Sequence, residues 1–424
     1  MARILIATYS MYGSWFSLQL EEEGHSVDIW LMDHFNDYSL VLDGIIKPPS
    51  KARPNFTNYD LVMFDLTGRP KIAEEVLNLG VPCIGDGDLH SELEDNRLLG
   101  IQIMEECGIG VPFYESFNDI GTAKRFVKKT NKTYVFKPNG GQDQETASTY
   151  VSKSPEDLLA YLDKLSGLSK GVEFILQEVV SGTEISTEGW FNGEDFFLIN
   201  GTLEEKKFMN EGKGPNTGCS GNLVWLYDQT NKPFIFREGL EKMKGFLQEY
   251  DFRGMIDLNT IVTDSRLYGL EWTPRFGYDA SATLYTCFNG LGDFLGECAS
   301  GGSPSVDIIN TYAAGVRLSI PPYPSEIRGK HPEEVPIEGL EEDEIIKTTF
   351  LYDCMCDGSD GYMSCGVNGL VAVPMGNGGT IQEAFGKVHH KIKNIHIPDM
   401  QFRTDIEKST TDRYRILDGM GWLR

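Results

Sequence analysis

The sequence predicts a multidomain protein of combined α/β and α+β character. Its 424 residues, 40% of them hydrophobic, are enough for about two to four domains or subdomains. Short apolar runs alternate with helical patterns over the first hundred residues. Several long strand-like segments follow between residues 183 and 277, as in an antiparallel sheet. Together these patterns predict a parallel α/β unit followed by mixed α+β units.

An N-terminal α/β domain is predicted over residues 1–111. The predicted strands are buried and apolar, and cover residues 3–7, 26–32, 59–66 and 81–86. The predicted helices cover residues 15–25, 73–80 and 91–108, the last as one continuous amphipathic helix. Strands and helices that alternate over short connections indicate a parallel sheet with helices on both faces.

Three further units are predicted after this domain. A small lid subdomain, residues 112–185, has strands at 133–141 and 172–182 and a helix at 155–167, with Ser154 as its N-cap and Pro155 at its first position. An antiparallel core covers residues 186–312. A C-terminal domain covers residues 313–424, and it begins with a surface segment rich in proline and acids at 320–344.

The net charge of −25 argues against nucleic acid or an anionic membrane as the main partner, because either would be repelled. No apolar run approaches the roughly 20 residues of a membrane helix, and the N-terminus lacks a signal-peptide pattern, so we expect a cytoplasmic protein. Cys354, Cys356 and Cys365 could form a metal or redox site. The absence of paired C-x2-C spacing favours unpaired thiols instead.

Two motifs suggest a nucleotide site. Lys137 ends an apolar strand before a glycine turn, where it could reach a phosphate, although many strand-end lysines are only solvated. Glu178 ends another apolar strand, whose backbone could pair with an adenine edge. Glu184, six residues later, could accept hydrogen bonds from ribose hydroxyls. Two exposed carboxylates without a ligand are the alternative interpretation.

Carboxylates inside apolar strands suggest a cation. Asp257 and Glu271 lie in such strands, and burying a carboxylate without a partner is unfavourable. Mg²⁺ with nucleotide phosphates is the usual oxygen-ligand case. Thr273 and Arg275 share the strand face of Glu271, so the same site could bind a metal and a phosphate or carboxylate. A buried salt bridge with an arginine is the alternative.

Residues 211–222, "EGKGPNTGCSGN", contain four glycines, which predicts a loop wrapped closely around a ligand. Lys206 and Lys207 precede it. Basic residues before a loop with exposed amides predict an anion or zwitterion site, whose substrate-binding residues would be Gly214, Pro215, Asn216, Thr217 and Gly218.

The ordered motifs resemble the ATP-grasp superfamily and, within it, glycinamide ribonucleotide synthetase (phosphoribosylamine–glycine ligase). The resemblance rests on "QEVVSGTEIS", "EEKKFMNEGKGPNTG", "FRGMIDLN" and "LEWTPRFG", in that order after the lysine strand. It extends to "GVPCIGD" and "LEDNRLLG" near the start, and to "GLVAVPMGNGGTIQEAF" and "FRTDI" near the C-terminus, so it covers most of the chain.

The resemblance implies a mechanism and a set of roles. ATP lies between the lid subdomain and the antiparallel sheet, a substrate carboxylate attacks the γ-phosphate, and an amine displaces phosphate from the acyl phosphate. Lys137 and Arg97 hold phosphates, while Glu178 and Glu184 hold adenosine. Mg²⁺ (or Mn²⁺) is bound by Asp257, Glu271 and Thr273. Arg275, Lys206 and Lys207 act at the reaction centre.

Several segments depart from the family pattern. The loop after the first strand, "ATYSMYGSWFS", has one glycine where the family has several, and the lid loop "GGQDQETAS" is polar. We therefore weigh three functions: a ligase that joins glycine or another small amino acid to an amine other than phosphoribosylamine, the orthodox purine-pathway enzyme, and a catalytically silent nucleotide-binding module. Small-molecule substrates and a homodimer are the expected partners.

Overall fold

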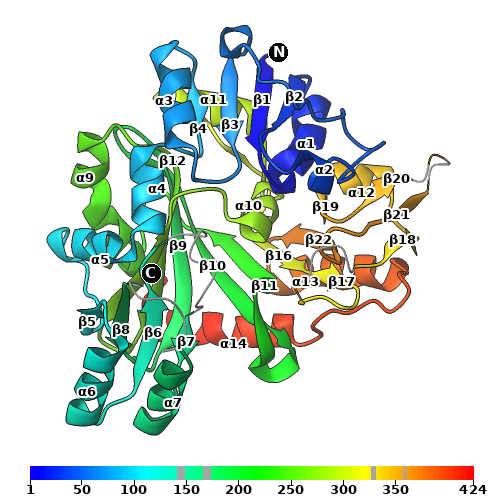
Figure 1. The fold of residues 1–424 in the computed structure, drawn as a ribbon. Helices are drawn as coiled ribbons and strands as arrows, with labels where there is room; N and C mark the ends of the chain where they lie inside the picture. The colour runs from blue at the N-terminus through cyan, green and yellow to red at the C-terminus, as the bar shows by residue number, and fades with distance from the viewer. Residues whose placement is uncertain (141–148, 166–172, 326–330, 357, 359–360) are drawn as a thin grey trace.

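The computed structural model describes residues 1–140, 149–165, 173–325, 331–356, 358 and 361–424. Figure 1 shows a blue N-terminal domain above a long central sheet and a smaller teal unit beside the lower end of that sheet. The yellow-to-red C-terminal elements lie on the opposite side. One parallel sheet and several antiparallel sheets confirm the predicted fold class.

The N-terminal sheet is parallel, with strand order β2-β1-β3-β4. Its strands match the four predicted ones: β1 (Arg3–Thr8), β2 (Ser26–Leu31), β3 (Leu61–Phe64) and β4 (Cys83–Ile84). The helices of this domain are η1 (Tyr12–Trp15), α1 (Phe16–Glu22), α2 (Phe35–Tyr38), η2 (Phe56–Asn58) and α3 (Pro70–Asn78). Because the strands are parallel, the loops that follow them meet at one edge of the sheet.

The single helix predicted for residues 91–108 is wrong. The chain forms two helices there, α4 (Asp88–Asp95) and α5 (Arg97–Glu106). Asn96 separates them, and its side chain accepts a hydrogen bond of 3.2 Å from the amide of Leu99. This N-cap starts a new helix in a new direction, so that Arg97 becomes the first residue of α5.

The lid subdomain has an antiparallel sheet of its own, with strand order β5-β8-β6-β7. Its elements are β5 (Tyr114–Phe117), α6 (Ile120–Thr130), β6 (Tyr134–Pro138), β7 (Tyr150–Val151), α7 (Pro155–Leu165) and β8 (Phe174–Glu178). The predicted N-cap is confirmed, because Ser154 accepts a hydrogen bond of 3.1 Å from the amide of Asp157. A separate apolar cluster fills this subdomain. Residues 141–148, which carry most of the polar lid loop, lie outside the described residues.

The central sheet is antiparallel, as predicted, with strand order β13-β12-β9-β10-β11-β16-β22-β17 and β19 paired to β22. Its strands are β9 (Thr183–Asn192), β10 (Phe196–Met209), β11 (Lys213–Leu226), β12 (Arg253–Val262), β13 (Leu267–Thr273), β16 (Tyr312–Val316), β17 (Leu318–Ser319), β19 (Thr349–Leu351) and β22 (Leu370–Gly378). Strand β9 spans residue 185, and the sheet continues past residue 312. The four-part domain division therefore stays a proposal.

The loop conformation predicted for residues 211–222 is wrong, while their contact with a ligand stays a prediction. The segment is the turn η3 (Asn210–Gly212) and the first part of β11, so it forms a two-stranded hairpin with β10 (Figure 1). Gly212, Gly214 and Gly218 have φ angles of 64°, 81° and 71°. These left-handed conformations explain the glycines, because they serve the turn and the irregular pairing.

The remaining elements cover the sheet or extend the C-terminal part. The helices are α8 (Phe234–Glu238), η4 (Leu240–Met243), α9 (Lys244–Glu249), α10 (Tyr278–Tyr285), α11 (Leu291–Ala299), α12 (Glu342–Lys347), α13 (Ile381–Asn394) and α14 (Ile406–Gly419). The short strands are β14 (Phe288–Asn289), β15 (Asp307–Ile308), β18 (Glu333–Ile337), β20 (Met355–Cys356) and β21 (Tyr362–Cys365). Among the helices in the described ranges, none combines the length and apolar character that crossing a membrane requires.

The eight cysteines are free thiols. Cys354 and Cys365 are buried, and the Cys365 thiol donates a 2.9 Å hydrogen bond to Asp353. Burial and the nearby Asp353 raise the pKa values of both thiols well above the ordinary range. Both groups are therefore held as neutral thiols.

Candidate active site

One face of the central sheet carries a row of polar side chains. Asp257 on β12 lies opposite Thr273 on β13, and Asn259 lies opposite both Ser186 on β9 and Glu271 on β13. Side chains two residues apart on a strand, and partners across strands, point to the same face. The predicted metal residues Asp257, Glu271 and Thr273 therefore share one surface.

Two ion pairs join this face to groups from distant parts of the chain. Arg97 Nη1 lies 3.0 Å from Glu271 Oε2, and Lys206 Nζ lies 2.6 Å from Glu184 Oε1. The amide of Asn259 also donates to Glu184, at 3.3 Å. The side chains of Glu271 and Glu184 are 42% and 41% exposed, so both carboxylates remain accessible to a ligand.

The helix α5 brings Arg97 to the sheet. The indole of Trp272, on β13, donates a 3.0 Å hydrogen bond to the carbonyl of Gly100, and the side chain of Asn139 accepts one of 2.9 Å from the amide of Leu98. Arg97 also donates to the carbonyl of Pro138 at 3.3 Å. The start of α5 is therefore tied both to β13 and to the end of the lysine strand β6.

Lys137 is the most buried cation of this group, with only 6% of its surface exposed. Burial lowers the pKa of Lys137 to about 8, although Glu271 opposes the shift. Within the described residues its ammonium group has no hydrogen-bond or ion-pair partner. A buried ammonium without a partner favours binding of an anion such as a phosphate.

Burial and neighbouring charges shift the pKa values of the two predicted carboxylate ligands of the metal. Burial tends to raise the pKa of Glu271, but Arg97, Lys206 and Lys137 outweigh it and lower this pKa to about 2. Asp257 behaves in the opposite way, because burial together with two neighbouring acids, Glu188 and Glu204, raises its pKa well above the ordinary range. The pKa values of the two predicted metal ligands are thus shifted in opposite directions.

The donor set fits a cation that arrives with a nucleotide. Within the described residues, no group of three or more His, Cys, Asp or Glu side chains is arranged to hold a metal ion by itself. Glu271 is ionised and accessible, while Oδ1 of Asp257 has no hydrogen-bond partner and its Oδ2 accepts from Ser186 at 3.0 Å. Two carboxylates would then need phosphate oxygens and water to complete the shell, which is the usual arrangement for Mg²⁺.

A cleft of about 720 Å³ opens beside this face. Its lining includes Arg97, Glu271, Thr273 and Arg275 from the predicted site, together with residues at the edge of the N-terminal sheet. Arg275 is held there by Glu94, with nitrogen–oxygen distances of 2.7 and 3.0 Å. The cleft therefore joins the polar face to the N-terminal domain.

Other predicted residues lie apart from these ion pairs. Glu178 forms an ion pair of 2.7 Å with Lys132 in the lid subdomain. The stretch from Gly214 to Gly218 lies on the exposed part of the hairpin, and its contact with the site is a 3.2 Å hydrogen bond from Thr217 Oγ1 to the carbonyl of Lys206.

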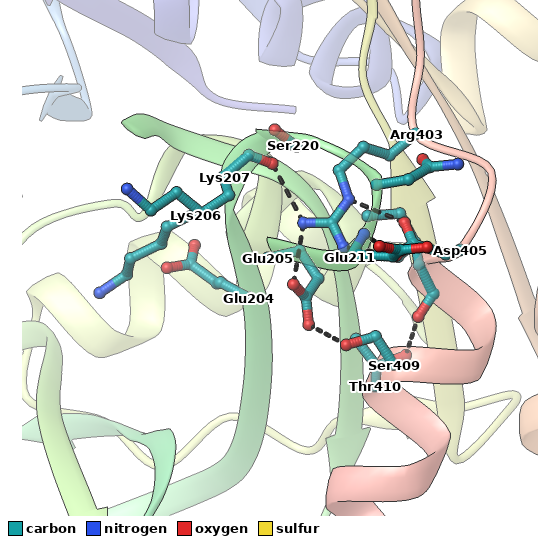
Figure 2. A network of polar contacts seen from close by, with 12 residues as sticks. Glu204, Glu205, Lys206, Lys207, Glu211, Ser220, Arg403, Asp405, Ser409 and Thr410 are labelled. Carbon is teal, nitrogen blue, oxygen red and sulfur yellow. Dashed lines mark hydrogen bonds and ion pairs between the residues drawn. The ribbon is translucent and has the colours of Figure 1, made fainter. Parts of the chain in front are cut away.

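Lys206 and Lys207 follow one another on β10, yet both extend to the same side of the strand in Figure 2. Consecutive residues of a regular strand point to opposite faces. The pairing of β10 with β11 shifts register between Glu205 and Lys207, and again between Lys207 and Met209. The extra residues of this bulge lie on β11, so β10 lacks regular pairing opposite them, which permits the observed arrangement.

Three backbone amides of the loop after β1 are bonded within the protein. The hydroxyl of Thr8 accepts hydrogen bonds from the amides of Ser10 and Met11, at 3.2 and 2.9 Å. The amide of Gly13 donates to the buried carboxylate of Asp65 at 2.8 Å. These three amides are therefore not available to an anion.

Sequence reasoning missed several residues of this site. Asn259 could have been found, because it lies two positions after Asp257 on the same strand face. Glu94 lies in a helical segment without any signal of its role. Arg403 and Arg413, which contact β10, lie about two hundred residues further along the chain.

Residues 99–281 match the ATP-grasp (A) domain of phosphoribosylglycinamide synthetase. The phosphoribosylamine–glycine ligase of Thermotoga maritima is 25% identical over 328 residues, which are 74% of this chain and 78% of that protein. The crystal structure of the Thermotoga maritima ligase superposes with a TM-score of 0.71 at 19% identity, over 95% of this chain and 99% of that one.

A second solved structure shares the fold. The biotin carboxylase domain dimer of the Hydrogenobacter thermophilus 2-oxoglutarate carboxylase, in complex with MgADP, ADP and bicarbonate, superposes with a TM-score of 0.62 at 12% identity. The match covers 100% of this chain and 98% of that one.

Proposed function

We propose that this chain is an ADP-forming carboxylate–amine ligase of the ATP-grasp superfamily, because residues 99–281 match the ATP-grasp domain of phosphoribosylglycinamide synthetase and the chain resembles the phosphoribosylamine–glycine ligases. One observation carries the proposal. Arg97, Lys137 and Lys206 lie close enough to Glu184 and Glu271 to act on one another electrostatically, in a protein whose net charge is −25, and Arg97 and Glu271 also line the cleft. Three cations gathered in an acidic protein suit the binding of a polyphosphate.

The proposed reaction has two steps. An oxygen of the substrate carboxylate attacks the γ-phosphorus of ATP, the bond to the β-phosphate oxygen breaks, and ADP leaves. The amine then attacks the acyl carbon, phosphate leaves with the bonding electrons, and the amine loses a proton. The chain's own contribution is alignment of the reactants and neutralisation of the charge that moves between them.

The proposed roles follow the positions of the side chains. Lys137 and Arg97 hold phosphates, Glu184 holds the ribose, and Glu178 lies beside the adenine edge of β8. Mg²⁺ (or Mn²⁺) neutralises phosphate charge when it is bound, and Asp257, Glu271 and Thr273 would hold it. The groups proposed to contact the carboxylate substrate or the transferred phosphoryl group are Arg275, Lys206, Lys207 and residues Gly214 to Gly218.

We infer that the carboxylate substrate is glycine or another small amino acid and that the amine is not phosphoribosylamine. The observation that favours this is the loop after β1, whose amides at Ser10, Met11 and Gly13 are already bonded to Thr8 and Asp65. A buried carboxylate at the base of that loop would also repel a phosphate. The orthodox purine-pathway enzyme and a silent nucleotide-binding module are the competing functions, and a homodimer is proposed.

The test is ADP release from MgATP against a panel of amino acids, with and without amines that include phosphoribosylamine. We expect one small amino acid to drive stoichiometric ADP and amide formation with an amine that carries no phosphate. Hydroxylamine added in place of the amine should trap the acyl phosphate as a hydroxamate. Product from glycine and phosphoribosylamine would establish the orthodox enzyme, and ATP binding without any turnover would favour the silent module.

Replacing Lys206 with alanine is expected to raise the KM for the carboxylate substrate by about tenfold, because a charge-assisted hydrogen bond to an anion is lost. The KM for ATP should change much less. Steady-state kinetics with each substrate varied in turn measures the split. The matched control is Lys213→Ala, which removes an exposed lysine of the same hairpin. A change confined to ATP would show that Lys206 belongs to the nucleotide site instead.

A further inference from the structure

The bulge between β10 and β11, whose extra residues lie on β11, needs an explanation, because regular pairing is lost where the two lysines lie. Figure 2 shows the ammonium groups of Lys206 and Lys207 on one side of the strand and Arg403 on the other. Arg403 comes from the segment just before α14, and its side chain is only 1% exposed. Because burying a charge is costly unless it is paired, this arginine is expected to bind and hold the groups around it.

Arg403 contacts strand β10 at two points. Its Nη1 donates to the carbonyl of Lys207 at 3.0 Å and to Glu205 Oε2 at 2.9 Å. Its Nε and Nη2 donate to Asp405 at 2.9 and 3.0 Å. Asp405 also accepts the amide of Glu211, in the hairpin turn, at 2.7 Å. One planar guanidinium thus links the bulge to a carboxylate that itself holds the turn (Figure 2).

Arg413, on α14, is a second arginine that contacts this region of the sheet. Regular pairing between β9 and β10 ends at Ser186 and Thr202. Beyond that point Arg413 donates to the carbonyls of Glu184 and Glu204, at 3.3 and 2.8 Å, so it spans the gap between the two strands. It also donates to Glu205 Oε1 at 2.7 Å. The backbone under the Lys206–Glu184 ion pair is therefore held from behind.

We propose that Arg403 is a positioning residue that holds the β10 backbone opposite the bulge and thereby directs Lys206 and Lys207 to the side of the strand on which Lys206 meets Glu184. Without its guanidinium, the buried Glu205 and the carbonyl of Lys207 lose a charged donor. The β10 backbone is then free to adopt regular strand geometry. Since side chains alternate along a regular strand, the change would turn one of the two lysines away.

The proposal concerns the geometry of the strand, and only the catalytic meaning of that geometry rests on the proposed function. The first experiment therefore needs no turnover. Brief acetylation of the folded protein, read by mass spectrometry, measures the relative reactivity of individual lysines. In Arg403→Ala we expect the labelling rates of Lys206 and Lys207 to change at least threefold relative to wild type, whereas Lys213 on the same hairpin keeps its rate.

Two comparisons make this result specific. Lys408→Ala removes an exposed ion pair from the same C-terminal segment and should leave the pattern unchanged. Arg403→Lys keeps the charge, but one ammonium cannot contact Glu205, Asp405 and the Lys207 carbonyl together, so the altered pattern should persist. Wild-type labelling of Lys206 and Lys207 in Arg403→Ala, or its restoration in Arg403→Lys, overturns the proposal. If Arg403→Ala does not fold, Glu205→Gln provides the same test.

A double-mutant cycle separates positioning from a general structural role. We expect Arg403→Ala to raise the KM of the carboxylate substrate about tenfold in the wild-type background, and to have little further effect on it when Lys206 is already alanine. Equal effects in both backgrounds would mean that Arg403 acts independently of Lys206, which contradicts the proposal. If no amino acid supports turnover, the labelling pattern still tests the role of Arg403, and calorimetric MgATP binding still tests the nucleotide site. Failure of the proposed function can therefore be distinguished from failure of this proposal.

Discussion

Replacing Glu271 with alanine is expected to lower MgATP-dependent ADP release by about a thousandfold while the fold persists. Glu271 is the ionised carboxylate of the pair proposed to hold the metal, because Arg97, Lys206 and Lys137 lower its pKa to about 2 against the effect of burial. Asp257 cannot replace it, because its Oδ1 is buried and its Oδ2 is already bonded to Ser186. Single-turnover ADP release at saturating Mg²⁺ measures the effect.

The removal of Glu271 also frees Arg97, which makes the result more informative. Arg97 loses its 3.0 Å partner and can then bind a phosphate alone. Nucleotide affinity without metal should therefore stay the same or increase, while turnover falls. Asp163→Ala is the control, because it removes an exposed carboxylate of the lid subdomain that forms an ion pair with Lys124. Retained turnover in Glu271→Ala would contradict the metal role, and proportional loss of nucleotide binding would indicate damage to the fold.

Replacing Asp279 with alanine is expected to destabilise the protein by about 3–5 kcal/mol, because it leaves a buried cation without its counter-ion. The side chain of Asp279, on α10, is fully buried and accepts hydrogen bonds from Arg317 at 2.6 and 3.0 Å. It also accepts one from the hydroxyl of Tyr352 at 2.6 Å. Arg317 in turn donates to the carbonyl of Thr217 at 2.8 Å, so the loss reaches the hairpin.

The midpoint and slope of urea unfolding, followed by circular dichroism, measure this loss of stability. Arg424→Ala removes an exposed ion pair with Asp418 and should leave the midpoint unchanged. Asp279→Asn keeps the shape of the side chain but not its charge, so it should be nearly as unstable as Asp279→Ala. A wild-type midpoint in both Asp279 variants would show that Arg317 finds another partner.

The architecture was largely predictable because its signals are local. Apolar runs of strand length, separated by helical patterns, predicted the parallel sheet around β1 and the long strands of the central sheet. The failures have local causes too. The amphipathic pattern of residues 91–108 continues through Asn96, so it could not show that this residue caps a new helix. The glycines near Pro215 indicate positive φ angles, but they do not say whether the segment pairs with a neighbouring strand.

The sequence predicted which types of residue form the candidate site, but it did not predict which of them contact one another. Asp257 and Glu271 were predicted as metal ligands because they are carboxylates in apolar strands. Their partners depend on strand register and on the packing of α5 against β13, which place Arg97 beside Glu271 although 174 positions separate them. The same holds for Lys206 and Glu184, whose contact depends on the pairing of β9 with β10. Interactions across such separations leave no pattern in either segment alone.

The contact between Arg403 and β10 also has a consequence for folding of the chain during translation. Glu205 precedes Arg403 by 198 positions, so a growing chain contains the bulge long before the residue that holds it. At roughly 5–20 residues per second, about 10–40 seconds of translation separate the two. The N-terminal domain can fold during that interval, but the two lysines reach their final orientation only after the segment before α14 has left the ribosome. A nascent or truncated chain that lacks Arg403 would therefore bind ligands differently from the finished protein.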